Sequence, residues 1–589
     1  MKKTACLIMA VALLVSGAAF QAEACTGLYI GKKCSADGHV MFGRCNDYHP
    51  TTIMPYIEIR DAVKGVPGRM VEGINGFRWE LPENTCRFVA VPYPDISDYG
   101  AFSSVAMNEY GVALTATITG YYCKEAREAD PDVAGGIAEE TIPNVLAPCC
   151  RTAREAIELL ARVVDEVGSA EQNIIIVADQ KEAWYMEIYS GHQYCAVRMP
   201  EDAVAVFGNE FMLDTVDPKD KGGVICSKDL FKLPKKAGFA VMDDNGRMNL
   251  RRTYSGDGRL YDFAHLRTWG GHRLLSPSTI GDYDHDTYYP LFFRPDGKVT
   301  LEQAMEVFRD RYFGTKYNPE ENDAWQNRVI GDEAQEEVHI VQVRDDLPAP
   351  MACVTWLTLS EAAHAPFVPI SSAITDCNPS YKYCAQDWGW HEDQAQHIYK
   401  RINAVCAQNR KIFSKGVKDY WKIVERHVMP EYEKVTARAA EAYSESPAEA
   451  GRILTDYCTS VQDDCIADAQ RIFDEMMWHM MVTTQTNPYG SDFTNLVTHP
   501  NPQPAFMARF DVARFAEWKG WTSEYSEKDR TLTLSKDGRS IKVRANGVHR
   551  TDLGSFTETD AAGNEKTDRA DAVLSDGRIL LPLMCLERL

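Results

Sequence analysis

The sequence lacks several features that would assign a chain quickly to a class. After the first 24 residues, no stretch of 18 apolar residues occurs, so we expect no membrane-spanning helix. Basic residues are in the minority: 63 Lys and Arg stand against 85 Asp and Glu, and the formal net charge is −22. A surface this acidic argues against nucleic acid or an anionic membrane as a partner. No internal repeat or low-complexity tract is found.

Patterns that bind metals and nucleotides are also missing. The stretch Asp282–Asp286 begins like a calcium loop, but Thr287 stands where that loop requires glycine and Phe293 where it requires glutamate. His391 and His397 are not at the four-residue spacing that places two ligands on one helix face. No glycine-rich phosphate loop follows a predicted strand. We therefore predict no catalytic metal and no cofactor.

The start of the chain has the form of an export signal. Two lysines precede an uncharged apolar run over Ala5–Phe20, and Ala22–Ala24 has the small-x-small form after which signal peptidase cuts. The apolar run is shorter than the roughly 20 residues of a comfortable bilayer span. The sequence therefore predicts a signal peptide over residues 1–24 and a protein in the periplasm or outside the cell. That cut makes Cys25 the first residue of the mature chain.

A cysteine at a free N-terminus carries its own base. An α-amino group has an ordinary pKa of about 8, close to that of a thiol, so it can accept the thiol proton directly or through a water. This is the logic of an N-terminal nucleophile hydrolase, and it needs no histidine. Downstream, Arg44 and Asp47 stand in GRCND. A cation near the sulfur favours the thiolate, and a carboxylate would orient the ammonium. The alternative for this pair is a surface contact beside a turn.

A lipid anchor is the alternative for Cys25 itself. A lipoprotein signal requires a large aliphatic residue three positions before the cysteine, with small residues between, whereas this chain has Ala22 there, followed by Glu23. An acylated Cys25 would make the protein an envelope binding module rather than an enzyme, because acylation blocks the nucleophile.

The order of predicted elements indicates stacked sheets covered by helices. Short β-rich segments, punctuated by Gly, Asp and Asn, run from Cys25 to about Arg127. Apolar residues at helical spacing follow over residues 152–168, then further strands, then an amphipathic helix over residues 301–313. This order favours an α+β fold over an alternating doubly wound sheet.

Two further regions are expected, because a chain of 589 residues is too long for a single core. From about Trp390 to Gln485 the pattern is almost wholly helical. A proline-rich linker follows, and the remainder returns to β-character, with hairpin alternation around Asp537 and Gly538.

The opening segment CTGLYIGKKCSADGHVMFGRCND, from Cys25 to Asp47, resembles that of dipeptidases in the N-terminal cysteine nucleophile hydrolase superfamily, relatives of bile-salt hydrolase and penicillin V acylase. The resemblance continues through MNEYGVALTAT, AWYMEI, FGNEFML and RTWGGHRLL and reaches the helical region. It implies a four-layer αββα core over residues 25–365 and a helical extension of the hydrolase over residues 366–485. The implied substrate is a dipeptide or short peptide, hydrolysed through a thioester on Cys25.

The resemblance also implies which residues act as the nucleophile and the general base, and which residues lie beside them. Cys25 would be the nucleophile and, through its amine, the general base. Arg44 and Asp47 would lie beside the sulfur and the amine.

The resemblance assigns the oxyanion hole to two asparagines. Asn209, in FGNEF, matches the residue whose side-chain amide donates to the oxyanion, and Asn108, in AMNEYG, matches a position that donates through its backbone N–H. Their alternative is a plain structural role as turn residues flanking strands. Arg267, in RTWGGHR, would complete the site, with Arg273 as the second candidate.

The end of the chain, DAVLSDGRILLPLMCLERL, resembles the small β-rich module at the N-terminus of copper amine oxidases. Residues 505–589 are expected to form this module, and it implies no copper here, because the segment contains one histidine, His549, and one cysteine, Cys585. It would contact the cell envelope or serve as a stabilising appendage. An acylase acting on bile-salt, penicillin V or acyl-lactone amides is the alternative enzyme, and a homo-oligomer stays open.

Overall fold

The structure is a computed structural model that describes residues 25–48, 53–94, 103–118, 121–387, 389–483, 505–547, 554–575, 577–586 and 589. The predicted signal peptide over residues 1–24, the predicted linker before residue 505 and His549 lie outside the described residues. Within them, every helix is too short or too polar to cross a membrane.

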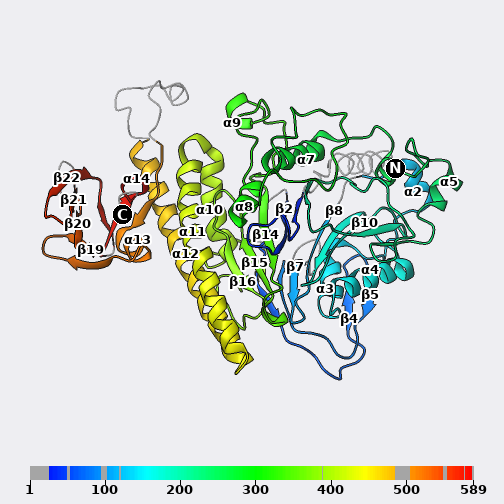
Figure 1. Cartoon of the computed structure of the whole chain (residues 1–589), viewed down its shortest axis with the longest axis horizontal. Helices are drawn as coiled ribbons and strands as arrows, with labels where there is room; N and C mark the ends of the chain where they lie inside the picture. Colours follow the sequence, from blue (N-terminus) through cyan, green and yellow to red (C-terminus); the bar gives the residue numbers. More distant parts are fainter. Residues whose placement is uncertain are drawn as a thin grey trace, which may run out of the picture.

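The first of two large sheets contains the start of the described chain (Figure 1). It has six antiparallel strands in the order β12-β1-β2-β14-β15-β16. Their bounds are β1 (Thr26–Ile30), β2 (Val40–Asp47), β12 (Val204–Phe207), β14 (Gln335–Val343), β15 (Cys353–Thr358) and β16 (Val368–Ser371). Strand β1 therefore lies inside the sheet, with β12 on one side and β2 on the other.

The second sheet has eight antiparallel strands in the order β13-β11-β10-β9-β8-β7-β6-β3. It contains the strands that were expected to follow the helix over residues 152–168. The bounds are β3 (Glu58–Arg60), β6 (Phe88–Pro92), β7 (Ser103–Asn108), β8 (Ala113–Ile118), β9 (Asn173–Ala178), β10 (Ala183–Ile188), β11 (Tyr194–Arg198) and β13 (Val224–Cys226). A separate hairpin pairs β4 (Met70–Glu72) with β5 (Arg78–Glu80).

Helices cover both sheets, which confirms the expected four-layer αββα core. Helix α4 (Ala153–Val167) begins at Thr152, whose side chain accepts from the N–H of Glu155, and its apolar face packs on β9 and β10. Helix α7 (Asp262–Leu275) packs on β12, and α8 (Leu301–Phe308) on β14. The smaller helices are α2 (Lys124–Ala129), α3 (Ile142–Leu146), α5 (Lys232–Ala237), α6 (Leu250–Ser255) and α9 (Pro319–Asn322).

Three long helices form the region that was expected to be helical: α10 (Ala395–Gln408), α11 (Arg410–Tyr443) and α12 (Pro447–Thr483). They pack against the core, and Arg309 after α8 donates to Glu425 on α11 at 2.5 Å, with both side chains buried. The core sheet extends past the predicted boundary at residue 365, because β16 (Val368–Ser371) pairs with β15. Figure 1 shows these helices between the core and the C-terminal module.

The C-terminal module is β-rich, as expected. Its five-stranded sheet contains β18 (Thr522–Ser526), β19 (Thr531–Lys536), β20 (Arg539–Arg544), β21 (Gly554–Thr559) and β22 (Glu565–Ala570). A three-stranded sheet contains β17 (Arg509–Asp511), β23 (Val573–Ser575) and β24 (Arg578–Pro582), accompanied by α13 (Val512–Trp518) and α14 (Leu583–Leu586). Asp537 and Gly538 both have positive φ in the β19–β20 turn, which confirms the predicted hairpin.

Candidate active site

Cys25 stands directly before β1, and the neighbouring strand β2 brings polar side chains to its sulfur. In this antiparallel pair Thr26 lies opposite Cys45. Arg44 Nη2 donates to Cys25 Sγ at 3.3 Å, and the Cys25 thiol contacts Asn46 Oδ1 at 3.7 Å. Cys25 is 2% exposed and Arg44 1%. A buried cation therefore lies beside the sulfur, which is an environment that favours the thiolate.

Arg44 has an acidic partner that the sequence did not point to. Its Nη2 lies 2.6 Å from Oε1 of Glu139, which belongs to a short 3₁₀ helix over Glu139–Thr141. Burial acts to lower the pKa of Arg44, but the charges of Cys25 and Glu139 outweigh it and raise the pKa above its ordinary value. Arg44 therefore remains a cation beside the sulfur at all working pH values.

A second set of side chains holds the main chain of Cys25. The Cys25 N–H donates to Asn209 Oδ1 at 2.9 Å, and the Cys25 carbonyl oxygen accepts from Arg267 Nη1. Arg267 also donates to Thr26 Oγ1 at 3.0 Å and, through Nη2, to Asn209 Oδ1 at 2.7 Å. Asn209 follows β12 and Arg267 lies on α7. Two donors at Oδ1 fix the orientation of the amide, in which Nδ2 is the hydrogen-bond donor.

The structure distinguishes the two arginines that were candidates for completing the site. Arg267 contacts Cys25, whereas Arg273, further along α7, donates to both carboxylate oxygens of Asp310 at 2.8 and 2.9 Å. The first candidate is therefore the one that the fold brings to the cysteine.

Asp47 does not join Arg44 at the sulfur. Successive residues of a strand point to opposite faces of the sheet, so a three-residue spacing on β2 separates the two side chains. Asp47 Oδ2 accepts from Cys45 Sγ at 3.4 Å and from Arg328 Nη2 at 2.7 Å. Burial raises the pKa of Asp47 to about 6, although Arg328 acts to lower it. The N–H of Thr26 donates to Cys45 Sγ at 3.3 Å, so Cys45 links Asp47 to β1.

Asn108 is not brought to the Cys25 group. Its backbone N–H donates to Val112 O at 2.9 Å, and its Oδ1 accepts from the N–H groups of Tyr110 and Val112 at 3.0 and 3.2 Å. Its Nδ2 donates to Ala147 O at 3.0 Å and Cys150 O at 2.7 Å. These bonds are those of a residue that fixes a turn after β7. They do not support the expected backbone donation to an oxyanion, because that N–H is already used.

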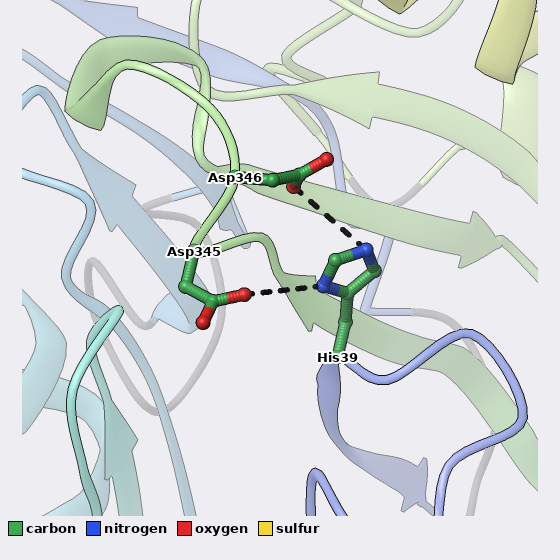
Figure 2. A group of neighbouring side chains, drawn as sticks. All are labelled: His39, Asp345 and Asp346. Carbon is green, nitrogen blue, oxygen red and sulfur yellow. Dashed lines mark ion pairs between the residues drawn. The ribbon is translucent and has the colours of Figure 1, made fainter.

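One group in the described residues has the spacing of a cation site. His39 Nδ1 lies 3.5 Å from Asp345 Oδ1, and its Nε2 lies 3.8 Å from Asp346 Oδ1 (Figure 2). Lys32 pairs with Asp345, and Arg344 Nη2 lies 2.9 Å from Asp346 Oδ2. Because both carboxylates already have cationic partners, we interpret this group as a cluster of ion pairs.

A family model and curated proteins both match this chain. Residues 24–423 match the model of Peptidase family C69. A protein named Probable dipeptidase B from Streptococcus pyogenes serotype M1 is 32% identical over 445 residues, which cover 72% of this chain and 86% of that protein. A Probable dipeptidase from Salmonella dublin is 29% identical over 381 residues, 63% of this chain and 86% of that one.

Among solved structures, a mutant conjugated bile acid hydrolase from Clostridium perfringens aligns over 62% of this chain and 97% of its own, with 9% identity and a TM-score of 0.26. A second variant of the same hydrolase aligns over 59% and 91%, with 11% identity and a TM-score of 0.27.

Proposed function

This chain belongs to peptidase family C69, and from that premise we propose that it is an exported dipeptidase whose nucleophile is the sulfur of Cys25. The names of its relatives support dipeptides as the substrate class. The observation that carries the proposal is that both the sulfur and the backbone of Cys25 are bound by buried polar side chains. Arg44 contacts its sulfur at 3.3 Å, while Asn209 and Arg267 bind its N–H and its carbonyl oxygen.

The proposed reaction has two halves. The α-amino group of Cys25 takes the thiol proton, and the sulfur bonds to the carbonyl carbon of the scissile peptide. The carbonyl oxygen becomes an oxyanion, to which Asn209 Nδ2 donates. The carbon–nitrogen bond then breaks as the ammonium returns the proton to the leaving nitrogen. A water, deprotonated by the same amine, attacks the thioester, and the proton returns to the departing sulfur.

The preceding cut is essential to this reaction. With a residue attached in front of Cys25, its nitrogen is an amide, which cannot accept a proton at accessible pH. Removal of residues 1–24 turns that nitrogen into an amine with an ordinary pKa of about 8, which suits a base that works near neutral pH.

The test compares two chains that differ by one residue at the start. One begins at Cys25, and the other retains Ala24 with no means of removing it. Both should give the same circular dichroism spectrum, but the second should hydrolyse dipeptides about 10²–10⁴-fold more slowly, because it lacks the general base. Cys25→Ser in the first chain should also fold and lose turnover, because a hydroxyl is far harder to deprotonate than a thiol. Full activity of the chain that retains Ala24 would overturn the mechanism.

Substrate class and export need separate measurements. A panel of dipeptides and N-acyl amides decides between a dipeptidase and an acylase, and preference for the N-acyl amides would overturn the dipeptidase proposal. The intact mass of the protein recovered from the periplasm or medium should equal that of residues 25–589. An added diacylglycerol would show that Cys25 is a lipid anchor and cannot be the nucleophile.

A further inference from the structure

A narrow pocket opens beside Asn209. The side chains that line it include Asn209, Glu210, Arg251, Arg259, Tyr121 and Tyr261. Asn209 Oδ1 accepts from the N–H of Cys25 at 2.9 Å, so one of the residues that line the pocket contacts the proposed nucleophilic residue. Its volume of ≈ 10 Å³ is that of about one water-sized group. A space this small suits the polar end of a substrate better than a bulky side chain.

Two of the charges in this pocket cancel. Glu210 accepts from Arg251 Nη2 at 3.2 Å and from Thr268 Oγ1 at 2.7 Å, and it lies 3.2 Å from His265 Nδ1. Burial acts to raise the pKa of Glu210, but Arg251 and His265 outweigh it and lower the pKa to about 2. Arg251 Nη1 donates to Tyr289 O at 2.8 Å. Glu210 and Arg251 are therefore a fixed, neutral pair.

Arg259 is the second arginine that lines the pocket, and it differs from Arg251 in its partners. It is exposed, and within the described parts of the chain its guanidinium has no hydrogen bond or ion pair. Acidic residues are near it in the sequence, but each has another partner. Asp257 accepts from Arg252 Nε at 2.7 Å, and Asp262 Oδ1 pairs with His285 Nδ1 at 2.7 Å. The pocket therefore presents one uncompensated positive charge, and an anion is the complementary ligand.

Aromatic rings form one side of the same opening. Tyr121 and Tyr261 lie edge to face with ring centroids 5.3 Å apart, and Tyr121 is 43% exposed. Rings at this position limit the directions from which a substrate can reach Arg259 and Asn209 together.

We propose that Arg259 binds the free α-carboxylate of the substrate and so limits cleavage to peptides that end one residue after the scissile bond. This inference rests on the proposed dipeptidase activity. In a dipeptide the α-carboxylate carbon is three bonds from the carbonyl carbon that Cys25 attacks. This short separation lets one substrate reach both residues, with its carboxylate at Arg259 and its carbonyl at Asn209, because both residues border the same pocket. A longer peptide presents a neutral amide at Arg259, where a carboxylate would bind through charge-assisted hydrogen bonds.

The test uses a dipeptide that the panel shows to be cleaved, together with its C-terminal amide, which differs only in that charge. Hydrogen bonds to charged groups contribute enough free energy for the unmodified enzyme to prefer the dipeptide by about 10–100-fold in kcat/KM. Arg259→Gln should lower kcat/KM for the dipeptide to the level of the amide and leave the amide unchanged. Arg259→Lys, which keeps the charge, should restore part of the preference. Arg247→Gln is the control: it removes an exposed arginine of the preceding loop that pairs with Asp243 outside the pocket.

The outcomes separate the two proposals. If the unmodified enzyme cleaves the dipeptide and its amide equally well, or if Arg259→Gln lowers both to the same extent, the role of Arg259 is overturned and the dipeptidase proposal stands. If the unmodified enzyme cleaves no dipeptide at all, both proposals are overturned.

Discussion

Replacement of Glu187 by glutamine should remove part of the pH dependence of this protein's stability. Glu187 lies on β10, fully buried, and its Oε1 holds the loop that follows Asn209. It accepts from the N–H groups of Met212 and Leu213 at 2.5 and 3.2 Å and from Tyr185 OH at 2.7 Å. Burial raises the pKa of Glu187 from 4.5 to about 7, although these hydrogen bonds act to lower it. The carboxyl group is therefore half-protonated near neutral pH.

The sign and size of the effect follow from these two pKa values. Between about pH 4.5 and 7 the folded chain keeps a proton on Glu187 that the unfolded chain has released, so the free energy of unfolding falls as pH rises through this interval. Above the folded pKa it levels off. Each unit of difference corresponds to about 1.4 kcal/mol, so the total loss is about 3 kcal/mol. Glutamine does not titrate, and its Oε1 can accept the same three hydrogen bonds.

The assay is urea unfolding of both proteins at several pH values from 4.5 to 8, with the two free energies subtracted at each pH. Other groups that titrate in this range, Asp47 among them, are present in both proteins and cancel in the difference. We expect the free energy of unfolding of Glu187→Gln, relative to that of the unmodified protein, to rise by about 3 kcal/mol from pH 4.5 to pH 8. A difference that stays constant from pH 4.5 to 8 would refute the assignment of a raised pKa to Glu187.

Two further predictions concern the residues that hold the site. Glu139→Gln should lower the free energy of unfolding by about 3–5 kcal/mol, because it leaves the buried Arg44 without its acidic partner. Thermal unfolding measures this, and the control is Glu449→Gln, which removes an exposed pair with Arg452 and should change the stability far less. Equal losses in the two variants would contradict the prediction. Gly271→Ala should cost about 1–3 kcal/mol and reduce dipeptide hydrolysis, because the added Cβ would lie 2.2 Å from Val206 Cβ and push α7, with Arg267, off the sheet. Gly281→Ala, where the added Cβ meets nothing within 4 Å, is its control, and a similar loss there would show that close packing at Gly271 is not the cause.

The sequence predicted the fold well where local pattern and pairing agree. The order of strands and helices indicated stacked sheets covered by helices, and the family resemblance implied the four-layer αββα core. Asp537-Gly538 indicated a hairpin by turn chemistry alone. The core boundary was less accurate, since β16 follows a loop with no compositional break to show that it returns to the first sheet.

The residues of the site could be predicted from the sequence where they stand in a recognisable motif. Arg44 was predicted from the GRCND motif and from the resemblance that this motif carries, and the alternation of β2 places Asn46 on the same face of the sheet. The same rule, applied to GRCND, would have separated Asp47 from Arg44. Glu139 and Arg328 were missed because they reach the site from distant segments that carry no pattern of their own.

The place of β1 inside the six-stranded sheet bears on the timing of maturation. The proposed new N-terminus is not a loose end, because the strand that starts there is hydrogen-bonded on both sides and Cys25 is 2% exposed. A protease acting on a folded chain would have to cut beside Cys25, a residue that is almost fully buried. Processing during translocation, while the chain is still extended, avoids that barrier. Under the proposed export and cleavage, the supply of active enzyme would therefore follow the rate of export, with no folded precursor kept for later activation.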